Sequence, residues 1–455
     1  MYEHGQVDEA MSRLDAMQLG KLLDKTLQKK SFHEQGLEEA TQDSVLLVSK
    51  IKSAVSLYQN SGEYEKAGEN LKLLADRLNT VDDCWNYANF CHKQNQFTEA
   101  ETYYHRALAL LKSQSDHEST NYQSQLSGLL NNLALLYSYN QQLTESESLY
   151  DKALEIRRRL AKTYPQAYEP DLAMTLSNLA TLYSYTQRLT ESESLYKEAL
   201  EIYRRMAQFN PQAYEPDMAG ILNNLAILYQ DTQRFTESES LYKEALEIYR
   251  RMAHSNPQAY EPDLASTLNN LANLYQTIQR FTEAESLYKE ALEIRRRLAQ
   301  SNPQAYELDL ASTLNNLAIL YRNTQRLTEA ESLSKEALEI YRRFAQSNPQ
   351  AYEPDVASTL GNLSFNAIFM KQYQEAEQCA REALAIDSTQ HWIATNLAAA
   401  LLFQGKYGEA EAIYCQYKDE LKNDFLGDFK QFAEAGVIPK ECEADVEKIK
   451  KLLEE

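Results

Sequence analysis

The sequence predicts an all-α chain made of stacked helix pairs, and three observations support this prediction. The phrase STLNNLANLY at residues 266–275 returns almost unchanged as STLNNLAILY at 312–321. Apolar residues recur at steps of three and four, which is the spacing of one helix face. Glycine and proline number only 12 and 10 in 455 residues, so few tight turns are expected.

The repeat is defined by the alanine of the phrase NLA, which we call the anchor. Successive anchors lie 46 residues apart six times, and the last interval is 34 residues. The anchors are Ala88, Ala134, Ala180, Ala226, Ala272, Ala318, Ser364 and Ala398. A fixed period of this length is typical of solenoids, in which each unit contacts only its neighbours.

Each unit contains two amphipathic helices. In residues 263–295 the apolar faces consist of Leu264, Leu268, Leu271 and Tyr275, followed by Ala284, Leu287, Tyr288, Ala291 and Ile294. Ala272 and Ala284 are small, so we expect the two helices to cross there. Leu271, Tyr275, Tyr288 and Ala291 should fill the seam between neighbouring units.

The ends of these helices are predicted from capping residues and prolines. Thr282 is expected to cap the second helix. That helix should end at the connector SNPQAYELD, because Pro303 cannot continue it. The next first helix should begin at Asp309. The 12 residues beyond a 34-residue unit are therefore a longer second helix plus a connector.

These residues resemble the tetratricopeptide repeat. Its pattern is matched by Leu271-Ala272, Tyr275, Ala284, Tyr288 and Ala291, and the register covers roughly residues 45–420. The long units with LNNLA look most like the kinesin-light-chain type. Two positions depart from the pattern, where Leu268 replaces a tryptophan and Arg296 a proline. The resemblance implies a right-handed superhelical solenoid, whose first helices line a concave groove that binds a protein or extended peptide.

An asparagine lies two positions before every anchor. A side-chain amide donates and accepts hydrogen bonds, so it can hold a peptide backbone. It can equally bond to a neighbouring helix and lock the stacking, and the sequence leaves both interpretations open. In the six long units these residues are Asn132, Asn178, Asn224, Asn270, Asn316 and Asn362. A second asparagine precedes some of them and should face the groove more squarely; it occurs at Asn131, Asn223, Asn269 and Asn315.

The units differ from one another at a few offsets of the first helix. The residue after the anchor varies, as do the two residues at the helix end. In the resembling family these offsets line the groove, so variation there is what a binding surface would show. Drift at exposed positions is the alternative. The varied residues that we add to the candidate partner-binding set are Asn273, Tyr139, Tyr185 and Arg322.

Composition excludes several classes of partner. A formal net charge of −21 repels phosphate backbones and anionic membranes, so neither nucleic acid nor a membrane is expected. Five scattered cysteines without a CxxC pair suggest free thiols in a reducing compartment. The beginning of the chain has no signal-peptide pattern. We therefore expect a cytoplasmic protein that is a monomer or a weak homo-oligomer.

No sequence motif indicates catalysis. We find no phosphate loop, HExxH motif or nucleophile elbow, and we expect no cofactor and no metal. Cys84 and Cys91 lie two helical turns apart, too far to share a tetrahedral ion. Arginine pairs such as Arg204-Arg205 are interpreted as solvated, with Glu201 four residues before Arg205. An anion-binding stripe is the alternative.

The predicted organisation has three parts: an N-terminal helical cap or partial repeat at 1–44, the repeat array at 45–422, and C-terminal capping helices at 423–455 that break at GVIP. The expected function is a non-enzymatic scaffold that binds a protein or extended peptide in the groove. The alternative is a sensor that regulates a separate enzyme or effector in a signalling or toxin system. A self-assembling array is the third possibility.

Overall fold

The protein is helical wherever its secondary structure is described. The computed structural model describes residues 21, 24, 37–60 and 63–454, and that part of the chain contains no strand. Two compact units form, residues 1–248 (unit 1) and 249–455 (unit 2). The all-α prediction is thus confirmed.

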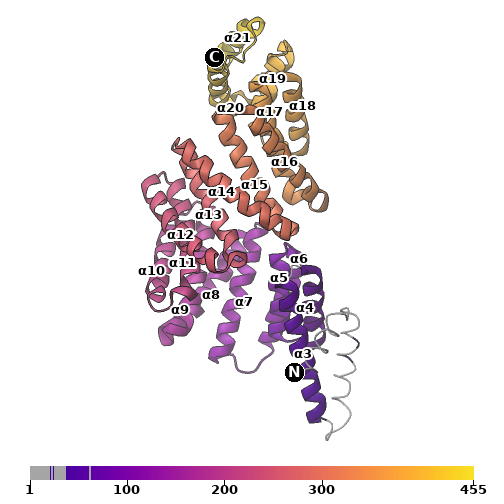
Figure 1. Ribbon diagram of the computed structural model, residues 1–455, viewed down its shortest axis with the longest axis vertical. Helices are drawn as coiled ribbons and strands as arrows, with labels where there is room; N and C mark the ends of the chain where they lie inside the picture. The colour runs from indigo at the N-terminus through magenta and orange to yellow at the C-terminus, as the bar shows by residue number, and fades with distance from the viewer. Residues whose placement is uncertain (1–20, 22–23, 25–36, 61–62, 455) are drawn as a thin grey trace. The chain divides into compact units, whose positions relative to one another are not determined.

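The helices follow one another along the chain in pairs (Figure 1). Those before the border between the units are α3 (Leu37–Asn60), α4 (Tyr64–Leu78), α5 (Val81–Lys93), α6 (Phe97–Lys112), α7 (Thr120–Tyr139), α8 (Leu143–Thr163), α9 (Pro165–Tyr185), α10 (Leu189–Ala207) and α11 (Pro211–Asp231). The border falls within α12 (Phe235–Ser255). The remaining elements are α13 (Pro257–Thr277), α14 (Phe281–Ser301), α15 (Pro303–Asn323), α16 (Leu327–Ser347), α17 (Pro349–Phe369), α18 (Tyr373–Ile386), α19 (Ile393–Leu402), α20 (Tyr407–Glu434), the 3-10 helix η1 (Lys440–Cys442) and α21 (Glu443–Glu454).

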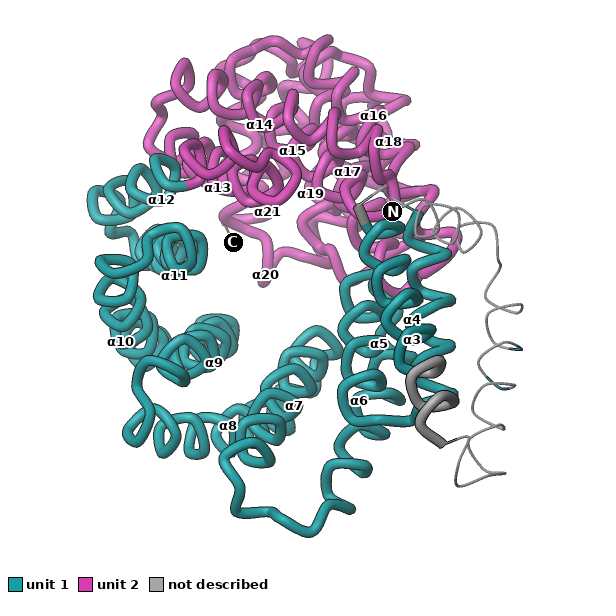
Figure 2. Tube along the Cα trace, turned by 60° about the horizontal axis from the view of Figure 1, so that its bottom comes forward, with its two compact units in different colours: residues 1–248 teal, residues 249–455 magenta. Residues whose placement is uncertain are grey.

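The first helices of neighbouring repeats contact one another as well as their own partners. Contacts join α5 to α7, α7 to α9 and α9 to α11 in unit 1, and α13 to α15 and α15 to α17 in unit 2. In unit 1 the helices follow a curve with α7, α9 and α11 on its inner side (Figure 2). The exposed face of these first helices is therefore the inner surface of unit 1.

The predicted seam is buried. Ala272 and Ala284 are fully buried where the two helices of the repeat cross, as expected. Leu271, Tyr275, Tyr288 and Ala291 are also buried, as expected of seam residues. Small residues at the crossing let the helix backbones approach, and the tyrosines fill the space on either side.

At several turns of the array an arginine pairs with the preceding repeat. The Arg188 guanidinium lies 3.7 Å from the ring centroid of Tyr183. It also pairs with Glu147 of the preceding second helix at 2.5 Å and with Glu191 of its own at 2.6 Å. Arg234 and Arg326 repeat the arrangement. These ion pairs thus connect each of these repeats with the one before it in the sequence.

Two predicted helix boundaries are wrong. The connector expected before Asp309 is helical, because α15 begins at Pro303. Proline suits the first position of a helix, where its missing N–H has no partner to lose. The side chain of Asn302 accepts a hydrogen bond from the N–H of Ala305 and caps that helix. Thr282 caps nothing, since α14 begins one residue earlier at Phe281 without a side-chain capping bond.

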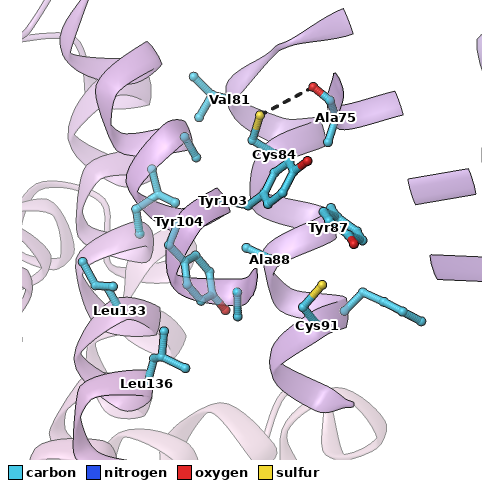
Figure 3. Close-up of a cluster of buried hydrophobic side chains, with 14 of the residues drawn as sticks. Ala75, Val81, Cys84, Tyr87, Ala88, Cys91, Tyr103, Tyr104, Leu133 and Leu136 are labelled. Carbon is cyan, nitrogen blue, oxygen red and sulfur yellow. Dashed lines mark hydrogen bonds between the residues drawn. The ribbon is translucent and has the colours of Figure 1, made fainter. Parts of the chain in front are cut away.

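The N-terminal core of unit 1 contains two of the free thiols. Cys84 and Cys91 of α5 are buried in an apolar cluster to which α4, α5, α6 and α7 contribute, and the Cys84 sulfur faces Ala75 of α4 (Figure 3). The Cys84 Sγ lies 3.8 Å from the carbonyl oxygen of Ala75, and burial raises the pKa of both thiols. All five cysteines are free, as expected, and these two are core residues.

The C-terminal region folds back after a kink. Leu421 has non-helical torsion angles of −111° and 15° inside α20, so residues 422–434 form a separate segment that we call the tail helix. The chain leaves the helical state around Val437, near the expected break. The predicted border at 422/423 falls inside α20 and the border at 44/45 inside α3. Residues 1–20, 22–23 and 25–36 of the predicted N-terminal region lie outside the described residues.

Candidate partner-binding surface

The first helix of each long repeat presents one exposed stripe. In α9 the exposed residues Met174, Thr181 and Tyr185 stand at steps of seven and four, with the half-buried Asn178 between them. Residues at this spacing lie on one face of a helix. We call the equivalent positions of all the first helices the inner stripe: six and two residues before the anchor, and one, four and five after it.

The inner stripe of unit 1 carries exposed apolar and aromatic side chains. Tyr139 and Tyr185 are 62% and 59% exposed, and Met174 and Ile227 are 39% and 37% exposed. The same offsets in α13 carry Ser266, Asn273 and Thr277. Exposed apolar groups gathered on one face mark a surface of interaction more often than single ones do.

The asparagines form hydrogen bonds between neighbouring first helices. Asn132 Nδ2 donates to Asn89 Oδ1 at 2.8 Å, and Asn178 Nδ2 donates to Asn131 Oδ1 at 3.2 Å. Unit 2 has corresponding bonds from Asn316 to Asn269 and from Asn315 to Thr359. These contacts give the asparagines a stacking role, and the half-buried ones, such as Asn132 and Asn178, keep part of their surface in the stripe.

The first asparagine of a pair was expected to be the more exposed to the groove, and in two pairs it is the more buried one. Asn131 and Asn269 are buried, whereas the next residues, Asn132 and Asn270, are half-buried. That expectation is therefore wrong for these two pairs. The physical reason is their amide partners on the next first helix, which draw Asn131 and Asn269 into the helix interface.

The remaining predicted site residues also have partners within the chain. Asn273 Oδ1 accepts a hydrogen bond from the Tyr288 hydroxyl, and Asn223 Nδ2 lies 3.4 Å from Asn224 Oδ1. The exposed Tyr185 donates its hydroxyl proton to Gln141 Oε1 at 2.9 Å. Asn224, Asn315 and Asn362 are half-buried.

A cavity of about 520 Å³ opens on the inner stripe between α5 and α7. It is lined by Asn89, His92, Lys93, Asn95, Phe97, Tyr104, Asn132, Leu135 and Tyr139. The rings of Phe97 and Tyr139 stack with centroids 5.9 Å apart. The imidazole of His92 meets the Tyr139 ring edge-on at 5.5 Å, and burial lowers its pKa, so it is neutral near pH 7. The cavity is thus aromatic, with amide groups at its side.

Three of the cavity residues that sequence reasoning missed stand at stripe offsets. Asn89, His92 and Lys93 stand one, four and five residues after the anchor Ala88, at the offsets of Leu135, Ser138 and Tyr139 one repeat later. Because Ala88 and Ala134 are separated by the same 46 residues as the later anchors, the stripe offsets could have been counted from Ala88 and would have identified these three residues.

At the other end of the array the chain's own tail helix covers the inner stripe. Phe432 packs against Phe365, Phe369 and Phe403, with ring centroids 5.5 to 5.6 Å apart. Arg322, a predicted site residue, lies over the Phe365 ring at 4.8 Å. Burial lowers the pKa of Arg322 to about 10, with Asp428 of the tail helix opposing the shift.

Family models for the tetratricopeptide repeat match residues 125–205, 217–297, 309–389 and 86–118. These matches cover more than half of the chain. The chain belongs to the tetratricopeptide-repeat family. No curated protein matches the sequence.

Solved tetratricopeptide structures share the fold. The apo form of RapI superposes with a TM-score of 0.56 at 15% identity, over 82% of this chain and 97% of that one. A signal-transduction ATPase with a tetratricopeptide-repeat sensor, from Pyrococcus horikoshii, gives a TM-score of 0.55 at 15% identity, over 89% of this chain and 55% of that one. A Rap protein complexed with competence and sporulation factor gives 0.50 at 14% identity, over 82% and 98%. At these identities the likeness concerns the fold.

The first arginine of each pair on the second helices joins neighbouring tetratricopeptide repeats, and the second arginine pairs within its own repeat. Arg204 pairs with Glu244 of the next repeat at 2.9 Å, and Arg205 pairs with Glu169 of the adjacent first helix at 2.7 Å. The expected pairing of Arg205 with Glu201 inside one helix is therefore wrong. Pairs of the Arg204 kind recur as Arg158–Glu198, Arg250–Glu290, Arg296–Glu336 and Arg342–Glu382. Exposed pairs of this kind each contribute roughly 0.2–1 kcal/mol.

Two further findings concern the part of the chain that the structure describes. None of its helices is both long and apolar enough to cross a membrane. No group of three or more histidine, cysteine, aspartate or glutamate side chains is placed there to hold a metal ion.

Proposed function

We propose that this tetratricopeptide protein is a non-enzymatic scaffold that binds a partner protein on the inner stripe of unit 1. The supporting observation is the exposed apolar set Tyr139, Met174, Tyr185 and Ile227. All four stand at stripe offsets, on three successive first helices.

The internal repeats serve as the comparison for this stripe. Thr277 and Asn323 occupy the offset of Tyr139 and Tyr185 in two later repeats, and Ser266 occupies the offset of Met174. Folding of a repeat therefore does not require an aromatic residue at that offset. Large apolar residues at an exposed position that folding does not require are the residues expected at an interface.

The chemistry of the stripe favours recognition over catalysis. Apart from Asp82, Lys93 and Asp231, the exposed groups on it are hydroxyls, amides and apolar side chains. Aromatic side chains supply large buried area at low cost in conformational entropy, and amides supply directional hydrogen bonds. The proposed role therefore needs no chemical reaction at the surface. We also propose a cytoplasmic location for this scaffold.

The experiment replaces stripe residues by those that other repeats carry. The stripe variant combines Tyr139→Thr, Tyr185→Thr and Ile227→Asn, each a residue found at the same offset elsewhere in the array. Tagged wild type and variant are used to enrich partners from the native cells, with quantitative mass spectrometry. We expect at least one protein to be enriched by the wild type and lost by the variant.

A matched control changes exposed aromatics outside the stripe. Phe209 is 85% exposed and Tyr164 is 51% exposed. Phe209→Ser and Tyr164→Asn also introduce the residues of later repeats, Ser255 and Asn210. The control variant should retain the partner, and both variants should keep the wild-type melting profile. An enriched set that the stripe variant leaves unchanged would refute the proposal.

A second candidate is a sensor that regulates a separate enzyme. The observation in its favour is the fold shared over 89% of this chain with the Pyrococcus horikoshii protein, whose repeats are described as a sensor. The distinguishing measurement is the activity of the captured partner with and without this chain. A change in that activity supports the regulatory role, and an unchanged activity supports the scaffold.

A further inference from the structure

The tail helix shows how the inner stripe holds an apolar ligand. Phe432 is fully buried, and its three aromatic neighbours all stand at stripe offsets. Phe365 is one residue after its anchor, and Phe369 and Phe403 are five after theirs. The stripe of unit 2 is thus occupied by an α-helix that lies across α17 and α19.

A charged residue of the tail helix accompanies its aromatic one. Asp428, one helical turn before Phe432, interacts electrostatically with Arg322, and burial raises the pKa of its carboxyl to about 6. Arg322 stands four residues after its anchor. The stripe of unit 2 therefore holds the helix through an aromatic anchor, and the acidic Asp428 lies on the same helix face; because Asp428 is buried, ionisation of its carboxyl opposes docking.

The cavity between α5 and α7 in unit 1 has apolar and aromatic residues at the equivalent offsets, and its cation stands one residue further along the preceding first helix than Arg322 does. Leu135 and Tyr139 correspond to Phe365 and Phe369, and they line the cavity together with Phe97. Lys93 at its mouth is exposed and makes no ion pair within the described residues. An unpaired cation beside an aromatic cavity, in a chain of net charge −21, complements an acidic group on the ligand.

We infer that the α5–α7 cavity and the adjoining stripe of α9 bind an amphipathic α-helix of a separate protein. That helix places an aromatic side chain in the cavity and a carboxylate about one turn away, near Lys93. The inference rests on the proposed function and specifies the partner as a helix, not an extended peptide. Helices that bind in grooves use anchors at steps of three, four and seven; in the tail helix Phe432 contacts the stripe, whereas Phe425 and Phe429 pack against Tyr414 of α20.

The test uses a labelled peptide of residues 421–436, which has the required chemistry, and the full-length chain. Fluorescence anisotropy measures the dissociation constant. We expect saturable binding that weakens at least tenfold with Tyr139→Thr, because that ring forms the wall of the cavity. Lys93→Glu should weaken binding about fivefold. A peptide with Phe432→Ala, and one whose helix is broken by Gly427→Pro, should bind at least tenfold more weakly.

Four results would overturn the inference. The peptide could fail to bind, or the Gly427→Pro peptide could bind equally well, which would indicate an extended ligand. Binding could respond to Phe369→Ala and not to Tyr139→Thr, which would show exchange with the chain's own tail helix. A concentration-dependent mass that Tyr139→Thr abolishes would make the occupant a second copy. None of these results would change the outcome of the partner-enrichment experiment with the stripe variant. This inference and the proposed function can therefore fail separately.

Discussion

Replacing Phe432 by alanine should undock the tail helix from the inner stripe of unit 2. The ring is fully buried against Phe365, Phe369 and Phe403. Truncation of a buried phenylalanine costs roughly 3–5 kcal/mol, through lost burial and the cavity that remains. Because every tenfold change in an equilibrium constant corresponds to about 1.4 kcal/mol, docking should weaken roughly a hundredfold or more.

Hydrogen exchange measured by mass spectrometry is the appropriate assay, because a long repeat array does not unfold as one two-state system. Amides of residues 422–434 should lose most of their protection in Phe432→Ala, while those of α13 and α14 keep theirs. Phe209→Ala is the matched control, since that ring is 85% exposed and its loss should change stability by less than about 0.5 kcal/mol. Equal protection of the tail helix in both variants would refute its docking on the stripe.

Three other predictions follow from the packing. A Cβ at Gly128 would lie 2.4 Å from the Trp85 ring, whereas one at Gly427 in α20 meets nothing within 4 Å; Gly128→Ala should lower the melting temperature by overpacking, and Gly427→Ala should raise it slightly. Burial raises the pKa of Asp428 to about 6, so docking is more favourable when this carboxyl is protonated than when it is ionised. Hydrogen-exchange protection of the tail helix should be full below about pH 4, fall as the pH rises through 6, and become independent of pH in Asp428→Asn. Deleting residues 272–317 joins Leu271 to Ala318 and restores the NNLA phrase, so circular dichroism should show a folded chain with a modestly lower melting temperature. An aggregated product would contradict the claim that each repeat depends only on its neighbours.

The fold could be predicted from the sequence because one periodic pattern determines it. Anchor alanines and seam tyrosines recur in most repeats, with Ser364 and Ser334 among the exceptions, so a single repeat describes most of the array. The boundary error at Asp309 came from treating Pro303 as a helix breaker, although proline is also a favoured first residue. The asparagine before it was the cap that could have corrected this error.

The binding surface was only partly predictable. The stripe offsets followed from the repeat, but an amide such as Asn131 serves a ligand or a neighbouring helix equally well, and only the structure shows which atoms it meets. The position of Phe432 could not be predicted, because the tail helix lies outside the repeated pattern. The identity of Gly128 is likewise explained by a ring on another helix, Trp85.

The most direct test of the central claim is site-specific photo-cross-linking in cells that make the protein. A benzophenone amino acid is placed at Tyr185 on the inner stripe or at Tyr164 off it, two tyrosines of similar exposure at 59% and 51%. The account predicts a discrete protein adduct from position 185, and none from position 164. An adduct of the same protein from position 164 alone, or equally from both, would contradict the inner stripe of unit 1 as the recognition surface.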